Sequence, residues 1–151
     1  MRTLTMGICL WFVGTASWAG SRQFDPWTCT GQFHNVIAHA DRIVVRDGGF
    51  IPRDSITNQR VLAVITKTNR IWQVYQNLQF KTNQQGSVCA GQGYPGLDWY
   101  QGTNLLALTA MHGCTTLSWE GFPSDAFLTK PSTQWFRKWF SGLKLDKSKY
   151  H

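Results

Sequence analysis

From residue 33 onward, the hydrophobic residues alternate between a helical and a strand-like spacing. Apolar residues three and four positions apart predict a short helix over 32–40. Residues 42–46 alternate with a period of two, so that Ile43 and Val45 share one face, which is typical of a half-buried strand. A continuous run of apolar, mostly β-branched residues over 61–65 predicts a second strand.

The second half of the chain predicts two longer helices with a group of strands between them. Thr68 is placed to cap a helix that runs to about Leu78, and Thr129 to cap a final helix that ends at Gly142. Short glycine-containing turns separate four strand-like segments, which therefore pair as an antiparallel meander. The four segments are 87–90, 97–101, 105–112 and 115–119. This order predicts an α+β domain, with an antiparallel sheet of two strands and then a four-strand meander, and helices packed on one face.

Each of the two longer helices carries an apolar stripe that we expect to face the core. The first stripe consists of Ile71, Trp72, Tyr75 and Leu78. The second consists of Trp135, Phe136, Trp139, Phe140 and Leu143. Core packing in these stripes would account for several of the chain's tryptophans.

The first nineteen residues have the pattern of an export signal. Arg2 gives a positive start, an apolar run follows over 6–13, and small residues before Gly20 suit a signal peptidase. The run is too short to cross a bilayer, so we expect an exported protein, periplasmic or extracellular, without stable membrane insertion after cleavage. The predicted divisions are a signal peptide over 1–19, an exposed lead-in over 20–32, a single α+β domain over 33–143 and a basic tail over 144–151.

The composition is basic, but the basic residues do not form a nucleic-acid-binding pattern. The net charge is +7, and Glu120 is the only glutamate, so scarce acids explain the balance. Lysine and arginine are scattered apart from the tail, with no stripe in which they alternate with aromatic residues. We expect no nucleic-acid partner and a general attraction to anionic lipid, an acidic partner protein or an envelope polymer.

Several short motifs resemble those of a set of small bacterial proteins of unassigned function. The motifs are the strand over 41–49 (DRIVVRDGG), the turn and hairpin over 89–102 (CAGQGYPGLDWYQG), Met-His-Gly over 111–113 and Leu-Ser-Trp over 117–119. The similar proteins have a cysteine-rich turn, a Phe-Tyr-x-Gly hairpin, a His-His-Gly and an Arg-Trp. The resemblance covers roughly residues 33 to 142 and implies a shared α+β domain, but no particular activity.

The chain departs from that pattern at positions where a site would need its side chains. Met111 stands where the first histidine would be, Gln92 and its neighbours replace further cysteines, and Ser118 replaces the arginine. A site formed by those residues in the similar proteins is therefore not expected to carry over unchanged.

Three cysteines follow the export signal, which is an odd number for an oxidising compartment. In an up-down-up order, Cys89 and Cys114 end at the same edge of the sheet. A disulfide between them would close a loop of about 25 residues and contribute roughly 3 kcal/mol. A bond from Cys29 to either cysteine is a competing interpretation, and no bond is a third.

A sharper hypothesis makes Cys89, His112 and Cys114 three ligands of a zinc or copper ion. Thiolate and imidazole are suitable donors for these metals, and His34 or His39 would be the fourth ligand. No closely spaced pair of ligands fixes two donors on one element, so we favour the disulfide, with His112 hydrogen-bonded beside it and no cofactor.

The sequence contains only weak candidates for catalysis. Cys114 and His112 suggest a nucleophile and its base, although the turn predicted at Gly113 leaves their geometry open. Asp98 and Glu120, with Asp125 behind them, are candidates for a glycosidase pair. Such acids more often solvate a strand or cap a turn, so an enzyme is the less expected interpretation.

Aromatic residues offer two surfaces for binding. Trp99, Tyr100 and Trp119 either pack in the core, which we favour, or form an exposed face for a sugar polymer or a partner protein. The loop over 91–96, with Tyr94 at its centre, is the best candidate for a projecting contact. The predicted binding residues are Gln92, Tyr94, Pro95, Trp99, Tyr100 and Trp119.

The favoured function is therefore a small exported binding protein of the bacterial envelope, an inhibitor or immunity-type module that acts through protein–protein contact. One alternative is a metal- or thiol-dependent protein that uses Cys89, His112 and Cys114. Another is a structural envelope protein held by the basic tail and the final helix. No feature of the sequence predicts an oligomeric state.

Overall fold

A computed structural model of the chain describes residues 26–49, 59–85, 93–120, 124–143 and 145. The predicted signal peptide, the first part of the lead-in and nearly all of the basic tail lie outside these residues. Within the described ranges, no helix has the length and apolar character needed to span a membrane.

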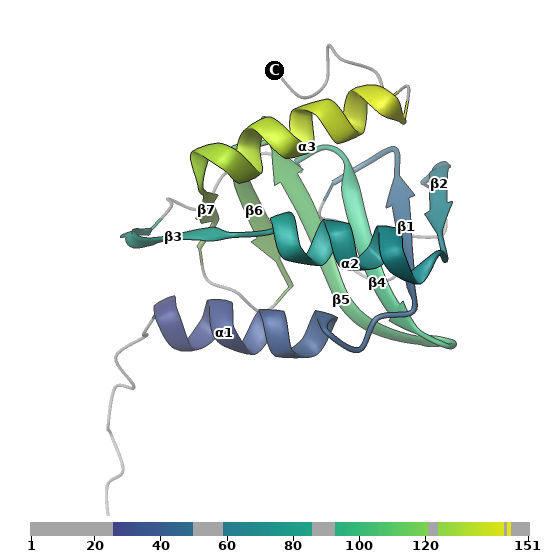
Figure 1. Cartoon of the computed structure of the whole chain (residues 1–151), viewed down its shortest axis with the longest axis horizontal. Coiled ribbons are helices and arrows are strands. Elements are labelled where there is room, and N and C mark those ends of the chain that lie inside the picture. The colour runs from purple at the N-terminus through teal and green to yellow at the C-terminus, as the bar shows by residue number, and fades with distance from the viewer. Residues whose placement is uncertain (1–25, 50–58, 86–92, 121–123, 144, 146–151) are drawn as a thin grey trace, which may run out of the picture.

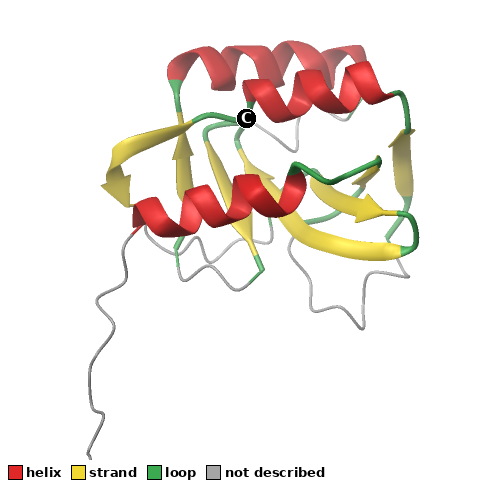
Figure 2. Cartoon of the chain, turned by 60° about the horizontal axis from the view of Figure 1, so that its bottom comes forward, coloured by secondary structure: helices red, strands yellow, loops and turns green. Residues whose placement is uncertain are grey.

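The described residues form three helices and seven strands, in one α+β arrangement. In chain order, they are α1 (Pro26–Ile37), β1 (Arg42–Arg46), β2 (Val61–Ile65), α2 (Thr68–Asn77), β3 (Phe80–Gln85), β4 (Gly96–Gln101), β5 (Asn104–His112), β6 (Thr116–Trp119), β7 (Ala126–Leu128) and α3 (Lys130–Gly142). The strands make one antiparallel sheet in the order β2-β1-β4-β5-β6-β7-β3. All three helices lie on the same face of this sheet, as the two views in Figures 1 and 2 show, which confirms the predicted fold class.

The strand order differs from the prediction at one edge of the sheet. The meander consists of β4, β5, β6 and β7, and β3 pairs with β7 at the far edge instead of preceding β4. Neither β3 nor β7 was predicted, and the strand predicted over 87–90 lies outside the described residues. The strand β3 is polar and β7 has three residues, so neither shows the alternation that identifies a half-buried strand.

The core lies between the sheet and the helices, and the strand alternation decides which side chains enter it. Ile43 and Val45 of β1 are fully buried and stand opposite Trp99 and Leu97 of β4, so all four point towards the helices. Phe33 of α1 packs against this layer, with its ring centroid 6.5 Å from that of Trp99. Burial of these large side chains is the main favourable contribution to folding.

The helix boundaries differ from the predicted ones in two places. The helix α1 begins at Pro26 instead of Gln32, so part of the predicted lead-in is helical. The N-cap of α2 is Lys67, which makes no side-chain capping bond, and Thr68 is the first helical residue. Thr129 caps α3 as predicted, because its side chain accepts a hydrogen bond from the Ser132 backbone N–H.

The helices α2 and α3 lie side by side and run in opposite directions (Figures 1 and 2). Two hydrogen bonds join the chain after α2 to the start of α3. The Gln79 backbone N–H donates to Ser132 Oγ at 3.1 Å, and the Thr129 N–H donates to the Gln79 carbonyl at 2.9 Å. These bonds fix one end of the helix pair, so the separation at the other end depends on the side chains there.

Candidate functional site

The three aromatic residues predicted as core or exposed face do not lie on one surface. Trp99 is fully buried, and its indole N–H donates to Thr109 Oγ1 at 3.4 Å. Trp119 is half-buried on the same face of the sheet, against Phe33. Tyr100 points to the opposite face, where the Arg42 guanidinium lies 4.5 Å from its ring centroid. The exposed aromatic face is therefore ruled out for this trio.

The loop predicted to project as a binding contact continues the sheet where the structure describes it. The Tyr94 N–H donates to the Met111 carbonyl, and the Met111 N–H donates to the Pro95 carbonyl at 3.0 Å. Tyr94 and Pro95 are both buried as a result, so neither is a projecting contact. Gln92 lies outside the described residues.

Cys114 is buried in the hydrophobic core, and within the described residues its thiol forms no disulfide. Burial raises the pKa of the Cys114 thiol to about 11, and the nearby positive charge of Arg137 opposes this shift only in part. The thiol therefore stays protonated at neutral pH, whereas a metal ligand or a nucleophile needs the thiolate. Cys89 lies outside the described residues, so the predicted disulfide with Cys114 stays a prediction.

His112 of β5 belongs to a chain of hydrogen bonds that runs through Ser118 of β6 to Asp125, just before β7, on the sheet face that points away from the helices. The Ser118 hydroxyl donates its single proton to Asp125, so His112 Nε2 must be the donor in its 2.7 Å contact with Ser118 Oγ. Among the described residues, no group of three or more histidine, cysteine and acidic side chains is arranged to hold a metal. The predicted zinc or copper site with Cys89, His112 and Cys114 therefore stays a prediction. Of its two described residues, His112 is hydrogen-bonded to Ser118, and Cys114 lies in the core.

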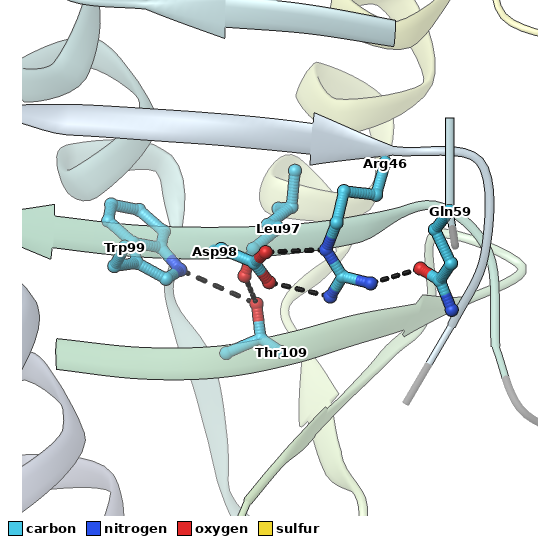
Figure 3. A network of polar contacts seen from close by, with 6 residues as sticks. All are labelled: Arg46, Gln59, Leu97, Asp98, Trp99 and Thr109. Atoms are coloured by element: carbon cyan, nitrogen blue, oxygen red, sulfur yellow. Dashed lines mark hydrogen bonds and ion pairs between the residues drawn. The ribbon is translucent and has the colours of Figure 1, made fainter. Parts of the chain in front are cut away.

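Asp98, a candidate for glycosidase chemistry, is instead half of a buried ion pair on that same face. Arg46 donates to it through Nε at 2.5 Å and Nη2 at 2.6 Å, and also donates through Nη1 to Gln59 (Figure 3). Burial raises the pKa of the Asp98 carboxyl, and the hydrogen bonds and charge of Arg46 oppose this shift. Both oxygens are occupied, so Asp98 holds β1 to β4 and presents no free carboxylate to a substrate.

A cleft between α2 and α3 is the described feature that is best suited to hold a ligand. It has a volume of about 440 Å³ and opens to solvent, which falls in the range of roughly 300 to 1,000 Å³ for small-molecule sites. It lies towards the end of the helix pair away from the Gln79–Ser132 bond. The lining residues are Arg70 and Gln73 of α2, Trp135, Lys138, Trp139 and Gly142 of α3, and Leu143.

Two stacked tryptophans form the aromatic wall of this cleft. Trp135 and Trp139 have ring centroids 5.5 Å apart and an angle of 21° between their planes. Phe136, which is buried, packs edge-on against both rings, so the tryptophans are held in place from the core side. Within the described chain, neither indole N–H has a hydrogen-bond partner. The wall therefore offers a rigid apolar surface with two free donors at its edge.

The helical repeat explains why these residues line one wall. Positions 135, 138, 139 and 142 are separated by three, four and seven residues, so they project from one side of α3. Gly142 ends the helix at the cleft, and a Cβ atom added there would have no described atom within 4 Å. Gly142 lines the cleft, so a larger side chain at this position can be added beside it without a clash.

Sequence reasoning assigned both tryptophans to the core stripe of α3, and both do pack against the core, but only the phenylalanines of the stripe are fully buried. Phe136 and Phe140 are fully buried, whereas Trp135, Trp139 and Leu143 are half-buried. The stripe of α2 divides similarly, because Trp72 is 53% exposed and Val74 takes an inward position. No periodicity in the sequence separates the buried phenylalanines from the half-buried tryptophans, because both belong to one stripe of α3.

Comparison with protein-family models, with curated protein sequences and with solved structures finds no match.

Proposed function

We propose that the protein is a small exported binding protein that holds a saccharide ring of an envelope ligand in the cleft between α2 and α3. The observation that carries this proposal is the stacked pair Trp135 and Trp139 in an open cleft of about 440 Å³. The predicted export signal supports the compartment. The ligand surface differs from the loop over 91–96, because Tyr94 and Pro95 are buried.

The chemistry of the cleft matches a sugar ring better than a purely apolar ligand. One face of a pyranose presents C–H groups, which pack on a flat indole, while its hydroxyls point outward from the ring edge. The Gln73 side chain supplies both donors and an acceptor for those hydroxyls, and the indole N–H groups of Trp135 and Trp139 supply two more donors. A ligand without polar edges would leave these groups without partners.

The rigidity of the aromatic wall lowers the entropic cost of binding a ligand. Each tryptophan is packed against a buried phenylalanine, so binding does not need to order the rings first. Side chains that are immobilised on binding cost about 0.5 to 1.5 kcal/mol each, and prior packing reduces that cost.

Filling the cleft from Gly142 tests the proposal. We expect Gly142→Leu to weaken binding to purified peptidoglycan and to soluble oligosaccharides by tenfold or more, because the added side chain enters the cleft. Tenfold corresponds to about 1.4 kcal/mol. Binding is measured by cosedimentation and by quenching of tryptophan fluorescence.

Ser141→Leu is the matched control for this experiment. Ser141 is exposed on α3 and does not line the cleft, so the same side chain is added one position away. We expect it to bind like the wild type. Unchanged binding by Gly142→Leu, or no binding of any saccharide by the wild type, would show that the cleft is not a saccharide site.

A further inference from the structure

We propose that the saccharide in the α2–α3 cleft is acidic, and that its carboxylate or phosphate group binds between Arg70 of α2 and Lys138 of α3. This inference rests on the proposed function and adds the charge of the ligand to it. Both basic residues line the cleft and come from different helices, so they approach a ligand from two sides.

The two helices that form the cleft carry no acidic residue at all. Their sequences are TNRIWQVYQN for α2 and KPSTQWFRKWFSG for α3. Within the described ranges, the side chains of Arg70 and Lys138 have no ion-pair partner, and both are exposed. A ligand anion would therefore not compete with any carboxylate of the described residues for either cation.

The four described aspartates lie outside these two helices, and each has a hydrogen-bond or ion-pair partner elsewhere. Asp41 accepts from the Gly102 backbone N–H, Asp47 pairs with Arg60, Asp98 pairs with Arg46, and Asp125 accepts from Ser118. The positive charge of the cleft thus adds to a chain whose net charge is +7. A cleft lined by one sign of charge raises the local concentration of ligands of the opposite sign.

The positions of the charges relative to the rings indicate an acidic group attached directly to the sugar ring. Lys138 stands between Trp135 and Trp139 along α3, so its ammonium group belongs to the same wall as the indoles. Arg70 lies one helical turn from Gln73 on the opposite wall. Arginine binds carboxylate and phosphate oxygens in a bidentate manner, whereas lysine acts as a point charge. A uronic acid or a sugar phosphate presents such a group within reach of the ring face.

The probes are a tetrasaccharide of galacturonic acid, its methyl ester and glucose 1-phosphate. The ester keeps the ring and its hydroxyls and removes only the charge. We expect the acid to bind about tenfold or more tightly than the ester in isothermal titration calorimetry at low salt. The difference should shrink steeply between about 20 mM and 500 mM salt, because exposed charges are screened over a Debye length of roughly 20 Å at the lower and 4 Å at the higher concentration.

Two double variants test which basic residues cause the preference for the acid over the ester. We expect Arg70→Gln with Lys138→Gln to bring the acid and the ester within about twofold of each other. Lys130→Gln with Arg137→Gln removes the same net charge from α3 at residues that do not line the cleft, and should keep the preference for the acid. Equal loss in both pairs would mean that only the net charge of the protein matters, and would overturn the inference.

The other outcomes separate this inference from the proposed function. Equal binding of acid and ester, both abolished by Gly142→Leu, would overturn the acidic ligand and keep the saccharide cleft. Binding of glucose 1-phosphate but not of the uronate would support the inference, with phosphate as the anion. Tighter binding of single-stranded oligo-dT than of either sugar would overturn it in favour of a nucleic acid, and binding of no probe by the wild type would overturn the proposed function as well.

Discussion

Among single residues, the buried pair of Arg46 and Asp98 has the clearest energetic consequence. Both side chains are almost fully buried, and Gly96, next to the guanidinium, leaves just enough room for it. A buried ion pair contributes little net stability, because desolvation of both charges offsets their attraction. Removing one partner leaves the other charge buried without compensation.

We therefore expect Asp98→Asn to lower the free energy of unfolding by about 3 to 5 kcal/mol, the usual cost of breaking a buried pair. The double change Arg46→Met with Asp98→Leu should recover most of that loss. Urea unfolding of the wild type, Asp98→Asn, the double variant and its two single variants, Arg46→Met and Asp98→Leu, measures both effects. If the double variant loses as much unfolding free energy as its two single variants lose together, the two buried charges are not coupled and the prediction is wrong.

Cys114 provides a prediction about pH. Its pKa is raised to about 11 in the folded protein, whereas an unfolded cysteine titrates near about 8.5. The folded state therefore favours the protonated thiol, and this contribution to stability is full below about pH 8.5 and declines as the pH rises towards the folded value. At pH 8, alkylation of Cys114 in the reduced folded protein should be slower than in the urea-unfolded protein by on the order of 100-fold, because little thiolate is present.

Mass spectrometry of the peptide that contains Cys114 measures this rate separately from those of Cys29 and Cys89. Equal rates in the folded and unfolded protein would show that the thiol is not buried. The same peptide map without reductant tests the predicted bond between Cys89 and Cys114, which would appear as a linked pair of peptides.

At the scale of elements, the two helix starts that were expected to be equivalent differ in how they are capped. Thr129 accepts a hydrogen bond from the Ser132 N–H, but Thr68 lies inside its helix after an uncapped Lys67. We expect Thr129→Ala to cost about 1 kcal/mol, the typical loss for a capping side chain. Thr68→Ala should be neutral or slightly stabilising, because alanine favours the helical conformation. Thermal unfolding compares the two, and equal losses would contradict the assignment of the caps.

The elements that could be predicted are those whose periodicity is set by burial on one face. The alternation of Ile43 and Val45 identifies β1, and the turn at 102–103 identifies the β4–β5 hairpin. In both places, the structure that the local sequence prefers is the one that the whole chain adopts. The strand β3 has polar residues and is fixed by pairing with β7, which lies some forty positions later. Such a pairing leaves no local pattern in the sequence.

The cleft could not be predicted for the same reason. Trp135 and Phe136 are neighbours in one apolar stripe, and only the position of α2 decides that the phenylalanine is buried and the tryptophan faces the cleft. The basic residues Arg70 and Lys138 are far apart in the sequence and appeared as scattered surface charges. The burial of Cys114 and Asp98 could not be predicted either, because it depends on how the strands and helices pack.

For the whole molecule, the strand order predicts where the structure opens most easily. The strands β4 and β5 have partners on both sides, whereas β2 and β3 form the two edges of the sheet. We expect amide hydrogen exchange to be slowest in β4 and β5 and faster in β2 and β3, because edge strands can open without breaking a second ladder. Exchange detected by mass spectrometry tests this order, and edge strands as protected as β5 would contradict it.

The position of β3 also has a consequence for a chain that emerges from the ribosome or a translocon one end first. The strands β2, β1, β4 and β5 can assemble as soon as residue 112 is available, but β3 is made earlier and must wait for β7. Contacts between distant segments form late because closing the intervening loop costs entropy. The helix α3 directly follows β7, so the wall of tryptophans reaches α2 only in the final step. A nascent or truncated chain therefore has most of its sheet before it has any cleft, and binding of the proposed saccharide would report that synthesis and folding are complete.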